Sequence, residues 1–214
     1  MHPAPSHSGV SSVAPSCLPL HESCDSHEVV ECGLDSPQRG AAESLVRRAF
    51  AAKHGADVHS FMPTLFALRG HRGRFCSVAG FRDAASGPLF LERYLRNPVQ
   101  QELSCKLDRE ISRDDIVEVG NLAGSGCGAA YRLALLLPSL LLSRGKRWLV
   151  FTATDAVRQM LERQRAPLFE LAAADARCVA GGIDNWGSYY DNDPRVLAGY
   201  LPDGLKLALA GARA

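Results

Sequence analysis

Apolar residues recur along the chain with two different periods, and each period predicts a different element. A helical period of about 3.6 predicts a helix that begins at Pro37 and ends before Gly55. A period of two on both sides of the Gly70–Gly73 turn predicts a hairpin with strands at 64–68 and 75–81. Helical and strand periods in one chain favour a mixed α/β or α+β domain.

The alternation of strands and helices continues up to residue 172. The predicted elements, in chain order, are an extended piece at 89–91, a helical stretch at 92–107 interrupted by Pro98, a strand at 116–122, a glycine-rich loop at 124–128, a helix at 129–142, a strand at 148–152, a helix at 155–164 and a strand at 168–172. This order favours a sheet with helices packed against it.

The first 35 residues lack any apolar period. They are rich in Pro and Ser and hold four of the seven histidines of the chain. Such a segment has no apolar face to offset the entropy of ordering, so we expect a flexible tail at 1–35 and a single domain at 36–214. The Cys and His residues of the tail match no closed zinc pattern, so the sequence predicts no metal site. They are Cys17, His21, Cys24, His27 and Cys32.

Charge and composition exclude two classes of protein. The 214 residues carry 24 Lys and Arg against 23 Asp and Glu, which gives a formal net charge of +1. This excludes a strongly basic nucleic-acid binder, and no apolar run approaches the roughly 20 residues of a membrane-spanning helix. The N-terminus lacks the basic and apolar regions of a secretion signal, and the odd number of cysteines, seven, favours reduced thiols. We therefore expect a cytoplasmic protein without integral membrane contact.

One carboxylate lies in the middle of an apolar strand. Alternation places Ile116, Glu118 and Gly120 on one face of this strand and two valines on the other. Burial raises the pKa of a carboxyl group towards neutrality, which suits a general base at pH 7. A structural glutamate paired with an arginine has the same pattern, and the strand alone does not separate the two hypotheses.

The glycine-rich loop after this strand predicts a phosphate-binding site, because glycine amides before a helix N-terminus can approach a pyrophosphate closely. A nucleoside-triphosphate loop is excluded, since no Lys-Ser or Lys-Thr pair follows the last glycine. A dinucleotide loop lacks its acidic residue about 20 positions later. The pyrophosphate loop of an acyl-CoA-dependent acyltransferase, which follows a strand that carries the base, explains Glu118 and the loop together.

Five motifs in the same order resemble those of the thermostable hemolysin family. They are Phe61-Met62-Pro63, LFLERYL at 89–95, IVEVGNLA at 116–123, WLVFTAT at 148–154 and WGSYY at 186–190. The resemblance covers roughly residues 40 to 200. That family in turn resembles the GNAT-like acyltransferases, among them the acyl-homoserine-lactone synthases. The resemblance implies a three-layer α/β/α fold whose central, mostly antiparallel sheet is splayed.

The resemblance also assigns candidate site residues. Glu118 matches the strand carboxylate of the lactone synthases, and Asn121 stands where they tend to place an Arg; these two are the candidate catalytic residues. The candidate donor-binding residues are Leu122, Ala123, Gly124, Ser125, Gly126, Cys127, Gly128, Arg132 and Thr152. The candidate substrate-binding residues, which would line a pocket for the acyl group or the acceptor, are Phe61, Met62, Arg93, Trp186, Tyr189 and Tyr190. The alternatives are a solvated Arg132, a small loop residue at Cys127 and ordinary packing for the aromatic residues.

The function implied is an N-acyltransferase. It would move an acyl group, in our interpretation a fatty acyl group, from a thioester to a small-molecule amine. The donor would be acyl-CoA or the acyl-phosphopantetheine of an acyl carrier protein, without a metal. The alternatives are a membrane-active hemolysin and a non-catalytic acyl- or CoA-binding protein of the same fold. The chain shows no export signal, and its most apolar helix has almost no polar face, which disfavours the membrane-active alternative.

Overall fold

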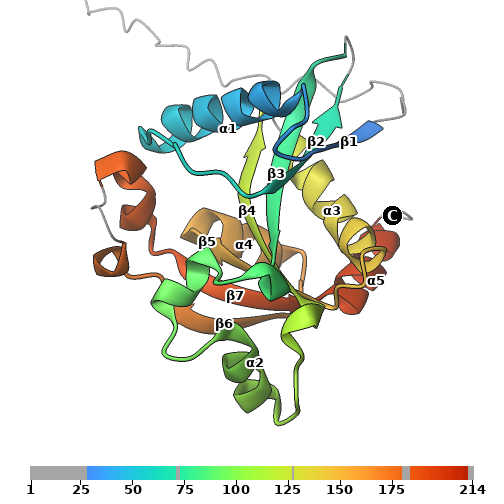
Figure 1. Ribbon diagram of the computed structural model, residues 1–214, viewed down its shortest axis with the longest axis vertical. Coiled ribbons are helices and arrows are strands. Elements are labelled where there is room, and N and C mark those ends of the chain that lie inside the picture. The colour runs from blue at the N-terminus through green and yellow to red at the C-terminus, as the bar shows by residue number, and fades with distance from the viewer. Residues whose placement is uncertain (1–27, 71–72, 127, 180–183, 212–214) are drawn as a thin grey trace, which may run out of the picture.

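Seven strands form one sheet in the computed structural model, which describes residues 28–70, 73–126, 128–179 and 184–211. Their order is β1-β2-β3-β4-β5-β7-β6, and neighbouring strands are antiparallel except β4 and β5, which are parallel (Figure 1). The strands are β1 (Glu28–Cys32), β2 (Thr64–Arg69), β3 (Phe75–Asp83), β4 (Ile116–Gly124), β5 (Trp148–Ala153), β6 (Leu168–Ala173) and β7 (Arg195–Tyr200). The predicted mixed fold with a mostly antiparallel sheet is confirmed.

Helices cover both faces of the sheet, and alternation along the strands decides which side chains meet which helix. α1 packs on the face of Leu65, Val78 and Ala123, whereas α3 and α5 pack together on the face of Phe66 and Ala79. We call these the α1 face and the α3 face; Figure 1 shows α3 and α5 side by side. The helices are α1 (Arg39–His54), α2 (Val99–Leu107), α3 (Ala129–Leu142), α4 (Asp155–Arg163) and α5 (Leu201–Gly211). Within the described residues, no helix combines the length and the apolar character that a membrane crossing needs.

The sheet begins inside the segment that the sequence assigns to a flexible tail. β1 pairs with β2 along its whole length, from Glu28 opposite Arg69 to Cys32 opposite Leu65, and Cys32 is fully buried. The expected boundary at residue 35 is therefore wrong for residues 28–32, which form a strand too short to stand out by its period. Residues 1–27 of the predicted tail lie outside the described residues, together with the four other Cys and His residues considered as metal ligands.

Residues 90–94 form a short helix rather than the predicted extended piece. This 3₁₀ helix, η3 (Phe90–Tyr94), is held by the Glu92 carboxylate, which accepts hydrogen bonds from the backbone N–H groups of Leu89 and Val99 at 2.8 and 2.9 Å. The Arg113 guanidinium donates to the same carboxylate at 2.6 and 2.9 Å, just before β4 begins. Glu92 and Arg113 together therefore fasten the segment between β3 and α2 to the start of β4.

β4 and β5 stay paired for only part of their length. The parallel pairing runs from Ile116 opposite Trp148 to Val119 opposite Phe151, although both strands continue beyond it. Beyond this point the two strands diverge, so the splayed sheet that the resemblance implies is present.

A bulge in β4 lies next to the place where the strands part. Asn121 and Leu122 together oppose the single residue Ala79 of β3, and Asn121 has a φ of 50°. A bulge bends the strand that carries it and increases its twist. The bulge therefore helps to turn the second half of β4 away from β5.

Replacing Glu92 with Gln is expected to lower the free energy of unfolding by about 1.5–3 kcal/mol, the range for hydrogen bonds to a charged group. Burial by itself would raise the pKa of Glu92, but the hydrogen bonds from Arg113 and two backbone N–H groups outweigh it and hold the pKa at about 2. A lowered pKa adds stability above the unfolded value of roughly 4.3, and this stability is lost as the pH falls towards 2. Urea denaturation at pH 7 and pH 3 measures the effect. The difference in the free energy of unfolding between wild type and variant should be smaller at pH 3 than at pH 7. An equal difference at both pH values would contradict the lowered pKa of Glu92.

Candidate active site

A cavity of about 980 Å³ lies where β4 and β5 part. Glu118 and Gly120 line it on the α1 face, and Leu149 and Phe151 line it on the α3 face. Since side chains of one strand alternate between the faces, the cavity passes through the opening in the sheet from one face to the other. Its volume lies at the upper end of the range for small-molecule pockets, roughly 300–1,000 Å³.

Glu118 is a buried carboxylate in this cavity and is only 3% exposed. Its Oε2 accepts a hydrogen bond from the N–H of Phe90 at 2.8 Å, and its Oε1 accepts one from the N–H of Leu91 at 2.9 Å. Burial raises the pKa of Glu118 against the lowering effect of these two bonds. Each carboxylate oxygen keeps a further acceptor position. Glu118 therefore holds η3 in place and retains the capacity to accept a proton.

Aromatic side chains form a wall beside Glu118. Trp186, Tyr189 and Tyr190 come from the irregular helical segment η6 (Asp184–Asn192), and Phe90 and Tyr94 come from η3. The ring of Trp186 lies 5.9 Å from that of Phe90 and 6.2 Å from that of Tyr190, measured between centroids. The hydroxyl groups of Tyr94 and Tyr190 share a hydrogen bond of 2.6 Å, which ties the two segments together. We call these five residues the aromatic wall.

Arg82 and His54 also line the cavity. Arg82 lies directly opposite Glu118 in the register of β3 and β4, and its Nη1 donates to the carbonyl oxygen of Pro88 at 3.3 Å. His54 ends α1 and meets the ring of Tyr189 edge on, at 5.4 Å between centroids. Burial lowers the pKa of His54, so its ring is mainly neutral at pH 7. A guanidinium and a carboxylate thus lie side by side on the sheet.

Asn121 holds the segment before β2 against the sheet. Its Oδ1 accepts a hydrogen bond from the N–H of Met62 at 2.8 Å, and its Nδ2 donates to the carbonyl oxygen of Ser60 at 3.4 Å. The Met62 side chain lies over Gly80 and Gly120, where a β-carbon at either position would come within 2.7 Å of it. The two glycines therefore make room for Met62 beside Glu118.

The glycine-rich loop lies at the other end of β4. The N–H of Ser125 donates to the carbonyl oxygen of Cys76 at 2.8 Å, which fastens the loop to β3. Gly128 precedes α3 with a φ of 79°, a conformation that glycine adopts without strain. Apart from the two chain neighbours, no heavy atom of the described residues lies within 4 Å of the place that a β-carbon on Gly126 would occupy. An open glycine backbone before a helix N-terminus suits an anionic group.

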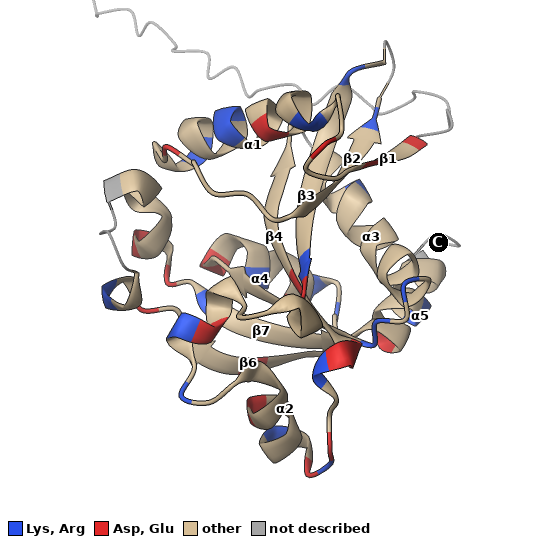
Figure 2. Ribbon diagram, in the orientation of Figure 1, with Lys and Arg blue, Asp and Glu red and all other residues tan. Residues whose placement is uncertain are grey.

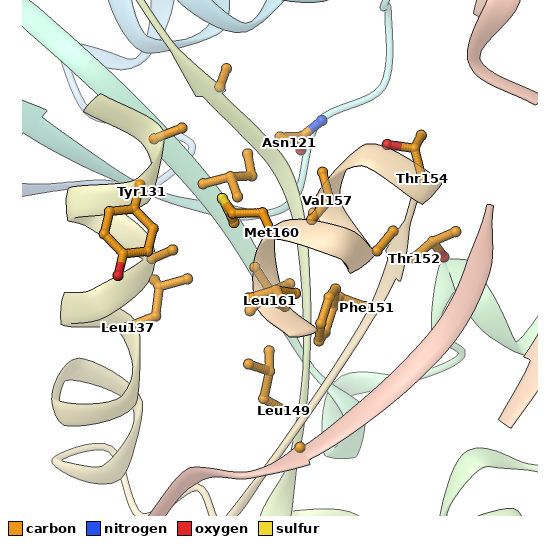
Figure 3. Close-up of a pocket in the computed structure, with 18 of the residues that line it drawn as sticks. Asn121, Tyr131, Leu137, Leu149, Phe151, Thr152, Thr154, Val157, Met160 and Leu161 are labelled. Atoms are coloured by element: carbon orange, nitrogen blue, oxygen red, sulfur yellow. The ribbon is translucent and has the colours of Figure 1, made fainter. Parts of the chain in front are cut away.

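The cavity has an apolar arm on the α3 face, between α3, α4 and α5. Val157, Met160 and Leu161 of α4 have the spacing of one helix face, yet they are only half-buried because they face the cavity (Figure 3). Leu149 and Phe151 of β5 also line this arm. Its other lining residues include Tyr131, Ala134, Leu137, Pro138, Leu201, Leu207 and Ala208. An apolar helix face turned to a cavity, not to a packed core, suits an apolar ligand.

Comparison with known proteins assigns the family. The family model described as thermostable hemolysin matches residues 33–205, which is most of the chain. The chain belongs to the thermostable hemolysin family. No curated protein matches it significantly.

Solved structures place this hemolysin-family chain in the GNAT-like fold. FeeM, an N-acyl amino acid synthase from uncultured soil microbes, is 17% identical with a TM-score of 0.58 over 88% of this chain and 99% of FeeM. The acyl-homoserine-lactone synthase LasI is 17% identical with a TM-score of 0.55 over 87% of this chain and 96% of LasI. TofI, solved with an inhibitor and MTA, is 17% identical with a TM-score of 0.57 over 85% of this chain and 95% of TofI. At this identity the likeness shows the fold.

Most of the site residues predicted for this family member line this same cavity. They are Phe61, Met62, Glu118, Asn121, Leu122, Ala123, Gly124, Gly126, Gly128, Thr152, Trp186, Tyr189 and Tyr190. Ser125, Arg132 and Arg93 do not line it. The Arg93 guanidinium instead stacks on the Phe90 ring, 3.7 Å from its centroid, and donates to the Phe90 carbonyl oxygen. Cys127 lies outside the described residues.

Several cavity residues are absent from the sequence-based prediction. Phe90 and Tyr94 lie inside the quoted motif at 89–95, so their aromatic character was an available signal. Arg82 has no such signal, because its place opposite Glu118 depends on the register of two strands. The apolar arm likewise depends on how α4 and α5 pack, which no local period specifies.

The left-handed conformation of Asn121 generates a stability prediction. Asn121→Gly and Asn121→Ala both remove the hydrogen bonds to Met62 and Ser60, but only Ala is strained at a φ of 50°. The Ala variant should therefore be about 1–2 kcal/mol less stable than the Gly variant, the cost of a left-handed residue with a β-carbon. Urea denaturation of the two variants measures the difference. Equal stabilities would show that the bulge relaxes to an ordinary conformation.

Proposed function

We propose that this protein transfers an acyl group from a thioester donor to the amine of a small molecule. The observation that carries the proposal is the position of Glu118, a buried carboxylate at the point where β4 and β5 part. From there the cavity leads along β4 to the glycine loop, into the apolar arm and along the aromatic wall. The path to the glycine loop would hold the donor, the apolar arm would hold the acyl chain, and the aromatic wall would contact the acceptor.

The opening between β4 and β5 suits the extended pantetheine chain of a donor. Pairing of β4 with β5 ends at Val119, so the backbone of β4 beyond it has no strand partner on that side in the described structure. An extended chain with amide groups can take the place of a missing strand. Leu122 and Ala123 line this path, and the glycine loop at its end suits the phosphate groups of CoA. An acyl carrier protein would present the same pantetheine.

The apolar arm supports a fatty acyl chain over a short acyl group. The apolar stripe of α4 faces the arm, and no residue of α4 is fully buried. A helix of this kind loses the burial that its apolar residues would contribute in a packed core. An alkyl chain in the arm would restore that burial, and an acetyl group would leave most of it empty.

The chemistry follows from the groups at the junction. The acceptor ammonium gives a proton to the Glu118 carboxylate, directly or through a water, and the free amine attacks the thioester carbonyl. A backbone N–H near Asn121 stabilises the oxyanion. The C–N bond forms, the C–S bond breaks, the amine loses its second proton to solvent and the thiolate takes up a proton. The products are an amide and a free thiol. FeeM, an N-acyl amino acid synthase with this fold, supports a reaction of this kind.

An acyl-transfer assay with Glu118→Gln tests the function. Fatty acyl-CoA thioesters and a panel of amines are incubated with the protein, with detection of free thiol and of the amide by mass spectrometry. The wild type should show kcat/KM rising with pH through a pKa above the ordinary range of glutamate, because burial raises the pKa of Glu118 and the base works deprotonated. Glu118→Gln should lower kcat by roughly 10²-fold or more and remove this rise of kcat/KM with pH.

A control is needed because Glu118 also holds η3 through the N–H groups of Phe90 and Leu91. Glu92→Gln loosens the same segment without touching the proposed base. It should retain most of the activity and a pH-dependent rise in kcat/KM, displaced slightly to lower pH because the Glu92 charge helps to raise the pKa of Glu118. Equal losses in the two variants, without a change in the pH profile, would leave Glu118 with only its structural role.

Gly126→Val tests the loop as a phosphate site. A β-carbon there meets no heavy atom of the described residues within 4 Å, apart from the chain neighbours, so the variant should fold. The valine side chain would occupy the space that a pyrophosphate needs. CoA affinity in calorimetric titration should fall roughly 10-fold or more, the scale of lost hydrogen bonds to a charged group. Gly40→Val, a glycine in α1 with equally open surroundings, is the matched control and should bind CoA normally. Unchanged affinity in a folded Gly126→Val protein would remove the loop from the donor site.

A further inference from the structure

We propose that Arg82 binds the carboxylate of an α-amino acid acceptor, and that Arg82 and Glu118 together recognise its zwitterionic end. This inference rests on the proposed function, because it names the class of amine that the site would accept. It concerns a residue with no sequence motif, and its basis is the geometry of two neighbouring strands.

Arg82 and Glu118 occupy directly opposed positions on β3 and β4, and both line the cavity. Opposed residues of an antiparallel pair project to the same face with β-carbons about 4.5–5.5 Å apart. The amine and carboxylate of an α-amino acid are separated by a single carbon atom. A positive and a negative side chain at this spacing therefore match the opposite charges of the zwitterion, with the ammonium at Glu118 and the carboxylate at Arg82.

Arg82 has no carboxylate partner within the described residues. Its guanidinium makes one hydrogen bond, to the Pro88 carbonyl oxygen at 3.3 Å, and it forms no ion pair with Glu118, whose oxygens face the N–H groups of η3. By contrast, the guanidinium of Arg113, just before β4, donates hydrogen bonds to the Glu92 carboxylate and to two backbone carbonyl oxygens. The half-buried Arg82 thus retains donors for an incoming anion.

The phosphate groups of the donor are too far away to be that anion. The glycine loop begins at Gly124, six residues along β4 from Glu118, and six residues of strand span about 20 Å. Arg82 is level with Glu118, so it lies at the reacting end of the cavity. The aromatic wall beside it suits an amino acid with an apolar or aromatic side chain.

The experiment compares phenylalanine with phenylalaninamide as acceptors, because the amide keeps the amine and the ring but lacks the negative charge. Wild type, Arg82→Gln and Arg82→Lys are assayed with one fatty acyl-CoA. Arg48→Gln is the control, since Arg48 is an exposed arginine of α1 that does not line the cavity. Thermal midpoints and far-UV circular dichroism confirm that each variant folds.

Arg82→Gln should lower kcat/KM for phenylalanine roughly 10- to 100-fold, mainly through KM, the range for lost hydrogen bonds between charged groups. Its kcat/KM for the amide should stay near that of the wild type, and Arg82→Lys should recover part of the loss because it keeps the charge. The ratio of the two acceptors cancels the different basicity of their amines. Equal losses for both acceptors, or no loss for either, would overturn the role of Arg82.

Failure of the proposed function gives a different result. If the wild type transfers no acyl group to any amine, calorimetric titration with free phenylalanine and phenylalaninamide still decides the inference. Binding of the acid that Arg82→Gln abolishes would support the Arg82 site in a protein that binds but does not react. Equal binding of both compounds, or of neither, by wild type and variant would overturn it.

Discussion

The parting of β4 from β5 is the constraint on which the whole site depends. Each of the two strands is held on its outer side: β5 pairs with β7 up to Ala153, and β4 pairs with β3 up to Gly124. The strands can therefore diverge after Val119 without either one leaving the sheet. The inner backbone groups of both strands then need other partners, because buried N–H and C=O groups are costly when unpaired. A ligand with its own amide groups would meet that need, and this is why we propose pantetheine as the ligand of the opening.

Two glutamates organise the segment that crosses the α1 face, and their surroundings separate their roles. Glu92 has the Arg113 guanidinium as its partner, and its pKa lies at about 2, so it is a fixed anion at every physiological pH. Glu118 accepts hydrogen bonds from two backbone N–H groups and forms no ion pair with another described residue, and burial raises its pKa. A carboxylate whose acceptor positions are all hydrogen-bonded supports the fold. A carboxylate with free acceptor positions and a raised pKa suits proton transfer. Both carboxylates accept hydrogen bonds from backbone N–H groups of this segment, so η3 is held at two places.

The sequence predicts the central elements of this fold well because they follow one another directly along the chain. The strand at 116–122, the glycine loop and the helix at 129–142 follow one another without a break, and α3 has the predicted bounds. β1, β7 and α5 have no counterpart in the prediction. β7 lies between β5 and β6, antiparallel to both, and that placement is a property of the sheet that no period in the sequence records. The candidate site divides in the same way: Glu118 and the glycines come from a contiguous motif, whereas Arg82 joins the site only through the register of β3 with β4.

The two faces of the sheet separate the two substrates of the proposed reaction. Arg82, Glu118 and the aromatic wall belong to the α1 side, and the apolar arm is built by α3, α4 and α5 on the other side. The opening in the sheet connects the two, so the thioester carbonyl would lie close to the plane of the sheet, with the acyl chain on one side and the attacking amine on the other. Such a division lets the aromatic wall select the acceptor and the helices select the acyl chain through different residues. β4 is the element common to both, since it carries the proposed base, the bulge and the path to the glycine loop.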